Sequence, residues 1–151
     1  EKKSIHDLYH VRAILEGYAV RLAVEHCTQE NILTFTEIVK EMREAARRAD
    51  TGEVIRLDFC AHEFFINLSG NSFLVDIWST IKTQVRRVLS YRHRSYPDLQ
   101  EIADSHLPFI ELMKNKNVDE AGRTMEAHIQ DALTDLLERW NNTDILKGAP
   151  S

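Results

Sequence analysis

Apolar residues recur every three or four positions along most of the chain, and no segment shows the alternation that is typical of a half-buried strand. Ser4 and Thr28 are placed to cap the first two helices, while Gly70 and Pro97 suit the end of the third and the first turn of the fifth. Because the connections are short, the pattern predicts an all-α fold, an antiparallel six-helix bundle. The helices are expected at about residues 4–26, 28–49, 53–68, 73–91, 97–114 and 118–140.

Two of these helices show a clear apolar stripe, which is expected to face the core. The stripe of the first helix consists of Leu8, Val11, Leu15, Tyr18, Ala19 and Leu22. That of the fourth consists of Leu74, Ile77, Trp78, Ile81, Val85 and Val88.

The length of 151 residues, of which 43% are hydrophobic, is enough for one domain with a real core. Residues 1–141 are expected to form this domain, and residues 142–151 a loose tail. The two cysteines, Cys27 and Cys60, are far apart in the sequence, which favours a reduced, cytoplasmic setting over a disulfide-bonded secreted one. No apolar run approaches the roughly 18 residues that a membrane span needs.

The formal net charge is −5, and basic residues form no block. Nucleic acid is bound chiefly through positive charge placed against phosphates. Direct DNA binding by these residues is therefore not expected.

Two polar residues lie on the apolar face of the third predicted helix. Asp58 is at the centre of that face and His62 is one turn later, whereas Arg56 and Glu63 fall on the opposite side. An ionised carboxylate is costly to bury unless it is paired, neutralised or bound to a cation. His62 is spaced to share such a cation.

The last two helices carry further inward histidines. His106 is stacked among apolar residues of the fifth helix, and His128 lies near the edge of the apolar stripe of the sixth. The two are almost equally distant from the turn near residue 117, so they come level in an antiparallel hairpin. Asp58, His62, His106 and His128 are therefore predicted to converge on one divalent metal ion in the core.

The ligand set of one carboxylate and three imidazoles suits zinc, nickel, manganese or iron and does not select among them; zinc is the metal we expect first. The alternative for each histidine is a hydrogen-bonded core residue, and for the aspartate an arginine partner. His6 and His10 have the same spacing of four but project away from the apolar stripe, which predicts a surface position. For His26 and His93, near helix ends, an ordinary polar or dipole role is expected.

Several runs of the sequence resemble the FCD ligand-binding domain, the C-terminal effector domain of FadR-type regulators in the GntR superfamily. They are "LYHVRAILEGYAVRLAV", "DFCAHEFFINLSGNSFL", "SHLPFIELMKNKNVDEA" and "AGRTMEAHI". The shared motif is an aspartate with a histidine four residues later, then Ser-Gly-Asn, then two histidines 22 positions apart. The helix count is similar to that of the VanR-like subgroup.

The resemblance implies that Asp58, His62, His106 and His128 bind the ion, and that a small organic acid binds beside it. It also implies a homodimer that contacts DNA through an N-terminal winged helix-turn-helix, which this chain does not contain. Two positions depart from the family pattern. Ala61 replaces a usual phenylalanine, and Pro108 interrupts hydrogen bonding within the fifth helix, next to His106.

Arg12 lies on the apolar face of the first helix with Glu16 one turn later, and an inward guanidinium needs an anion. That anion is either the effector carboxylate or an internal partner, Glu16 or Asp58. Arg92 and Gln84 on the fourth helix are weaker candidates for effector contact, because a solvated side chain is the common alternative at such positions.

The sequence thus predicts an effector-sensing domain of a bacterial transcriptional regulator and not an enzyme. The alternatives are a helical-bundle metalloenzyme acting on a small carboxylate and a metal-dependent dimerisation module. The enzyme is disfavoured because no second inward carboxylate stands out as a general base, and no H-E-x-x-H motif occurs.

Overall fold

The computed structural model describes residues 2–142, and these residues form only helices and their connections. The elements are α1 (Lys2–His26), α2 (Gln29–Arg47), α3 (Thr51–Leu68), α4 (Ser72–Ser95), α5 (Leu99–Asp104), α6 (Leu107–Lys114) and α7 (Val118–Asn142). The predicted all-α antiparallel bundle is confirmed, with the fifth predicted helix divided into α5 and α6. Residues 143–151, predicted to be a loose tail, lie outside the described residues.

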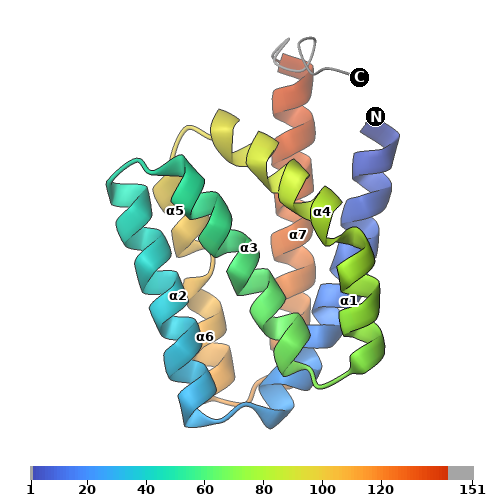
Figure 1. The fold of residues 1–151 in the computed structure, drawn as a ribbon, viewed down its shortest axis with the longest axis vertical. Helices are drawn as coiled ribbons and strands as arrows, with labels where there is room; N and C mark the ends of the chain where they lie inside the picture. Colours follow the sequence, from blue (N-terminus) through green and yellow to red (C-terminus); the bar gives the residue numbers. More distant parts are fainter. Residues whose placement is uncertain (1, 143–151) are drawn as a thin grey trace.

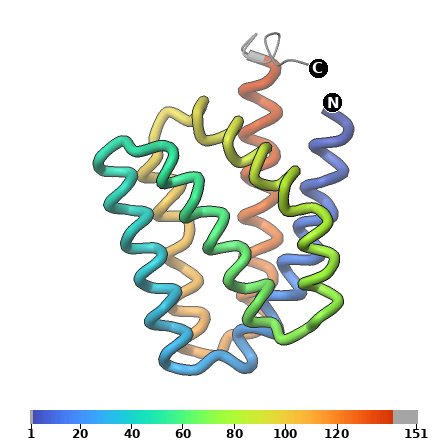
Figure 2. Tube along the Cα trace, in the orientation of Figure 1, coloured from blue at the N-terminus to red at the C-terminus, as the bar shows by residue number. Residues whose placement is uncertain are grey.

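The long helices α1 and α7 lie side by side, and α2 packs against α3 on one side and against α5 and α6 on the other (Figure 1). Helix α4 follows α3 and crosses in front of the bundle toward the start of α5 (Figure 2). Helix α3 contacts α1, α2, α4 and α5, so its side chains reach the middle of the molecule.

Short polar signals set the helix ends. Thr28 and Asn31 form a reciprocal capping box at the start of α2. Gly70, predicted to end the third helix, follows α3 with a φ of 68°, a conformation that costs glycine little. Pro97 precedes Asp98, the N-cap residue of α5, and so stands just before the helix that it was expected to begin.

The core has two apolar clusters. The larger includes the contacting rings of Phe35, Phe65 and Phe109, and the smaller surrounds Phe59 and Trp78 between α1, α3 and α4. Large apolar burial of this kind supplies most of the favourable free energy of folding.

The predicted apolar stripes are only partly correct. Val11 and Tyr18 of α1 and Ile77 of α4 are exposed, with relative accessibilities of 43%, 49% and 44%. On α1 the buried face is rotated to include Tyr9, Arg12 and other residues, because α1 packs against α3, α4 and α7 and not against one neighbour. None of the described helices combines the length and apolar character that a membrane span requires.

Candidate metal centre

Helix α3 carries Asp58 and His62 into the middle of the bundle. Both side chains are buried, each with 2% relative accessibility, as the position on the apolar helix face predicts. The Nε2 atom of His62 lies 3.4 Å from Oδ1 of Asp58. The two side chains therefore present one nitrogen and one oxygen toward the same point.

His106 reaches the same point from the break between α5 and α6. Ser105 caps the end of α5, and His106 is the N-cap residue of α6, in which Pro108 stands in the first turn. Proline has no N–H to donate to the carbonyl four residues earlier, and its ring clashes with the preceding helical turn. The helix is therefore interrupted here. The prediction of one continuous helix over 97–114 is wrong at this position, and the break places the His106 imidazole at the centre of the bundle.

Helix α7 supplies His128, which is half-buried. Its ring centroid lies 4.9 Å from that of His106 and 5.3 Å from that of His62. Asp58, His62, His106 and His128 together form what we call the four-residue cluster, in which one ligand atom from each residue lies within 4.8 Å of the others. The structure thus brings together all four residues that were predicted to bind an ion.

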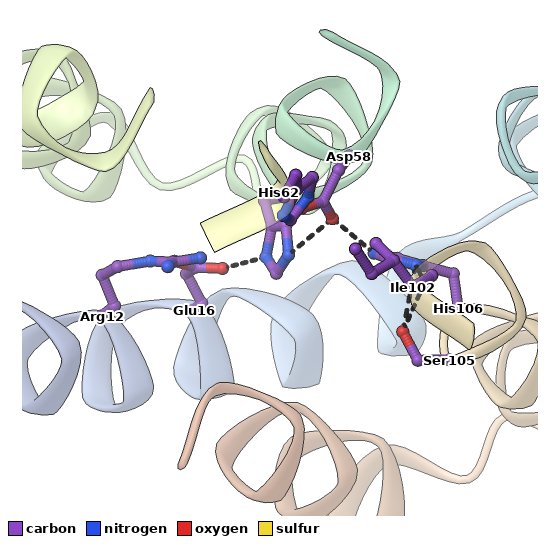
Figure 3. A network of polar contacts seen from close by, with 8 residues as sticks. Arg12, Glu16, Asp58, His62, Ile102, Ser105 and His106 are labelled. Atoms are coloured by element: carbon purple, nitrogen blue, oxygen red, sulfur yellow. Dashed lines mark hydrogen bonds and ion pairs between the residues drawn. The ribbon is translucent and has the colours of Figure 1, made fainter. Parts of the chain in front are cut away.

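The hydrogen bonding of His106 determines which of its ring nitrogens faces the cluster. Its Nδ1 lies 2.9 Å from the carbonyl oxygen of Ile102 (Figure 3), so Nδ1–H donates to that oxygen and Nε2 is the ring nitrogen that faces the cluster. This Nε2 lies 2.9 Å from Oδ1 of Asp58, an ion-pair distance. A divalent ion in this position would be held by the Asp58 oxygen and the His106 nitrogen.

The donor set fits a divalent ion. Zinc-to-ligand distances of about 2.0–2.1 Å in a tetrahedral site place neighbouring ligand atoms roughly 3.3 Å apart. The contacts of Asp58 Oδ1 with His106 Nε2 and His62 Nε2, at 2.9 and 3.4 Å, are close to this spacing. No cysteine is part of the cluster, so the donors are nitrogen and oxygen.

A buried ion pair on α1 stands behind His62. Glu16 contacts Nδ1 of His62 through one carboxylate oxygen, and Arg12 donates from Nε to the other at 2.7 Å (Figure 3). Both α1 side chains have 1% relative accessibility. The predicted internal pair of Arg12 with Glu16 is therefore present. The expectation that Asp58 is the only inward carboxylate is wrong, because Glu16 is a second buried carboxylate.

His93 was expected to have an ordinary role near a helix end, and that expectation is wrong. It is buried, and its Nε2 lies 2.6 Å from Oδ2 of Asp58. Helix α4 continues to Ser95, beyond the predicted end near residue 91, and this extra turn carries His93 to α3. Oδ2 of Asp58 is thereby held by His93 while Oδ1 faces the cluster.

The pKa values follow from these contacts. Burial opposes ionisation of Asp58, but His106, His62 and His93 outweigh it and hold its pKa well below the ordinary value. Burial also lowers the pKa of His62, but the carboxylates of Glu16 and Asp58 raise it to about 9. Burial, together with His106 and His62, holds the pKa of His128 well below the ordinary value, so its imidazole is neutral at pH 7.

The other two residues predicted to contact an effector, Arg92 and Gln84, have different surroundings. Nε of Arg92 is 3.5 Å from Oδ2 of Asp135 on α7, and neither atom has a hydrogen-bond partner. Gln84 is exposed in a surface groove of about 660 Å³ between α1 and α4. The residues that line this groove are Ser4, Ile5, Asp7, Leu8, Val11, Thr80, Ile81, Gln84, Arg87, Val88, Tyr91 and Trp140.

The remaining histidines have no part in the cluster. His6 and His10 are exposed on α1, as predicted, with their Nε2 atoms 3.0 Å apart. His26 is exposed in the last turn of α1, where a polar role was expected.

Residues 7–131 match the FCD domain family, so the chain belongs to that family. It is 29% identical to the Nta operon transcriptional regulator of Aminobacter aminovorans over 99% of this chain and 66% of that protein. It is 24% identical to the gluconate operon transcriptional repressor of Bacillus licheniformis over 98% of this chain and 63% of that protein. The chain therefore spans about two thirds of the length of these curated relatives or slightly less.

Solved structures show the same fold. E. coli McbR/YncC superposes with a TM-score of 0.81 at 17% identity, over 93% of this chain and 68% of that one. GntR of Streptococcus agalactiae superposes with a TM-score of 0.72 at 20% identity, over 86% of this chain and 58% of that one.

Proposed function

We propose that this chain is the effector-sensing domain of a GntR-type transcriptional regulator, which binds one divalent ion and a small organic acid. The observation that carries the proposal is the convergence of Asp58, His62, His106 and His128, whose ligand atoms lie within 4.8 Å of one another in the core. One carboxylate and three imidazoles are a donor set that suits a divalent ion. The transcriptional roles in the names of similar proteins support the rest.

Asp58, His62, His106 and His128 would hold the ion, with zinc favoured and nickel, manganese or iron allowed by the donors. A bound divalent ion supplies positive charge and open coordination positions, which suit a carboxylate. The protein's part is to orient the imidazoles: His106 through the carbonyl of Ile102, and His62 through Glu16.

The organic acid would lie between the ion and a second group of polar atoms. The hydroxyl of Tyr9 is buried without a hydrogen-bond partner, and burial raises the pKa of Tyr9. Nε of Arg92 has only the 3.5 Å contact with Asp135. Buried polar atoms without partners are rare, so Tyr9 is our first candidate for contact with the acid, and Arg92, whose contact with Asp135 is long, is the second. Arg12 already has an internal carboxylate, and Gln84 lies in the surface groove, so neither is assigned to the acid.

A regulator is favoured over a metalloenzyme because the inward carboxylates are already engaged. Glu16 is held by Arg12 and His62, and Asp58 by His93 and the cluster. Neither is free to remove a proton from a substrate. Binding of the acid would instead favour one arrangement of the helices, and so alter DNA contact by another domain of the regulator.

We also propose that the chain acts as a homodimer in the cytoplasm. Helices α1 and α4 expose large apolar side chains that a second copy would cover: Ile14 at 72%, Tyr18 at 49%, Phe73 at 78% and Ile77 at 44% relative accessibility. Such exposure is typical of an interaction surface. The net charge of −5 gives this domain itself no role in DNA binding.

The test is metal analysis of the purified chain followed by calorimetry. One equivalent of a divalent ion is expected, and titration with acetate, succinate and malate should give heat that the uncharged succinamide does not. The Tyr9→Phe variant should bind the same acids more weakly, by about fivefold or more if one hydrogen bond of about 1 kcal/mol is lost. A chain that binds no ion, or binds succinamide as tightly as succinate, would refute the proposal.

A further inference from the structure

A line of buried contacts connects α1 to the four-residue cluster. Nε of Arg12 donates to Oε1 of Glu16 at 2.7 Å, and Oε2 of the same carboxylate contacts Nδ1 of His62. On the far side of the ring, Nε2 of His62 lies 3.4 Å from Oδ1 of Asp58. Figure 3 shows Glu16 between Arg12 and His62, and His62 between Glu16 and Asp58.

The two oxygens of Glu16 have separate partners, and this fixes the carboxylate plane. A buried ion pair is costly to desolvate, and replacing it by apolar residues of similar volume is often neutral or stabilising. Stability alone is therefore a weak reason for the Arg12–Glu16 pair. The contact of the Glu16 carboxylate with Nδ1 of His62 suggests another role for the pair.

That nitrogen determines how the imidazole can act. When Glu16 accepts from Nδ1–H, the neutral ring has its lone pair on Nε2, the atom that faces Asp58. A carboxylate behind a ligating histidine also increases the basicity of the ring and fixes its orientation.

We propose that Glu16 is a positioning residue, which makes His62 a metal ligand through Nε2, and that Arg12 acts through Glu16. This rests on the proposed function, because it assumes an ion at the cluster. It gives Arg12 a role toward the metal in place of the contact with the organic acid that the sequence predicts. It also couples α1 to the ion, although α1 supplies none of the four cluster residues.

The first experiment is the Glu16→Gln variant, which keeps the size of the side chain and removes its charge. Zinc affinity is measured by competition with a chromophoric chelator, and helix content by circular dichroism. A loss of roughly 10- to 100-fold is expected, the range typical of residues behind a metal ligand. The matched control is Glu126→Gln, which removes an equal charge from a partly exposed pair with Arg21 at 2.6 Å and should change zinc affinity less than twofold.

The second experiment tests whether Arg12 acts through Glu16. Arg12→Met should weaken zinc binding in the wild-type background but have no further effect in the Glu16→Gln background. The double variant also leaves no unpaired buried charge, so it should fold even if Glu16→Gln alone does not. If the two substitutions lowered zinc affinity additively, Arg12 would not act through Glu16.

The third experiment needs no substitution. Long-range ¹H–¹⁵N correlation spectra of the zinc-loaded chain report the tautomer of each histidine, and His62 should carry its proton on Nδ1 with zinc on Nε2. Zinc on Nδ1, or unchanged zinc affinity in a folded Glu16→Gln variant, would overturn the inference while leaving the metal site intact. A wild-type chain that binds no ion would refute the proposed function as well.

Discussion

Two pairs of side chains in this molecule share the same spacing of four residues on a helix. Asp58 and His62 are on α3, and His6 and His10 are on α1. Either pair brings two ligand atoms close together, at 3.4 Å in the first and 3.0 Å in the second. The first pair is buried and the second is exposed.

The surroundings separate the two pairs. His62 is oriented by Glu16, Asp58 by His93, and further imidazoles approach from two other parts of the chain. The ring of His10 has a long contact of 3.3 Å with Gln130. Exposed side chains must lose rotamer freedom when they bind an ion, whereas the buried ones have lost it on folding. Helical spacing alone is therefore weak grounds for a metal site.

The largest effect is expected for Asp58→Asn, which keeps the size of the side chain but removes the negative charge at the centre of the cluster. Zinc affinity should fall by more than the roughly 100-fold upper value typical of residues that only support a ligand. Chelator competition measures this. If Asp58→Asn bound zinc as tightly as a His6→Ala variant does, the two pairs would not differ as described.

The pH dependence of metal binding should give the next largest effect. The pKa of His62 is about 9 without an ion, against an ordinary value of 6.5, so below pH 9 an incoming ion must displace a proton. Through this group, zinc affinity should rise by about tenfold per pH unit up to pH 9 and then level off. In the His62→Ala variant, which binds zinc weakly, this dependence of zinc affinity on pH should be absent. In the His10→Ala variant it should be unchanged.

The same raised pKa has a consequence for the metal-free fold. A group whose pKa is raised on folding contributes stability that is fully present below its unfolded value of about 6.5 and is lost as pH rises through the folded value. The metal-free chain should thus lose stability through His62 between about pH 6.5 and 9. Urea unfolding across this range checks the sign, and rising stability would contradict it.

Removal of the ion by a chelator should lower the melting temperature. An ion present at 100 times its dissociation constant stabilises the folded state by about 2.7 kcal/mol, which corresponds to roughly 5–10 °C for a chain of this size. Differential scanning calorimetry with and without chelator measures the shift. The His6→Ala/His10→Ala double variant should show the same shift as the wild type.

The smallest effect is expected for that double variant at neutral pH. Because His6 and His10 are exposed, zinc stoichiometry should stay at one ion and the affinity should change less than twofold. A second equivalent of zinc that disappears in the double variant would show that the exposed pair is also a metal site.

Part of this comparison could be predicted from the sequence, because polar residues at the centre of an otherwise apolar helix face are expected to be buried. Asp58, His62 and His106 stand out as polar residues on apolar faces, and the exposed position of His6 and His10 follows from the same analysis. The family match covers residues 7–131, whereas the domain bounds of 1 and 141 remain a prediction.

Other features depend on packing that helical periodicity does not reveal. Helix α1 contacts three other helices, so its buried face is too wide to appear as one apolar stripe, and Glu16 was missed as a part of the site. The signal was present, since Glu16 lies one turn after an inward Arg12. His93 was missed because the polar sequence "RHRS" gave no reason to extend α4, although this last turn packs on Asp58.

The most direct test of the central claim is X-ray absorption at the metal edge of the purified chain. The account predicts one ion per chain with three imidazole nitrogens and at least one carboxylate oxygen in its first coordination shell, and a spectrum that His6→Ala/His10→Ala leaves unchanged. Sulfur ligands, a spectrum that changes in that double variant, or a metal content no higher than that of the Asp58→Asn chain would contradict it.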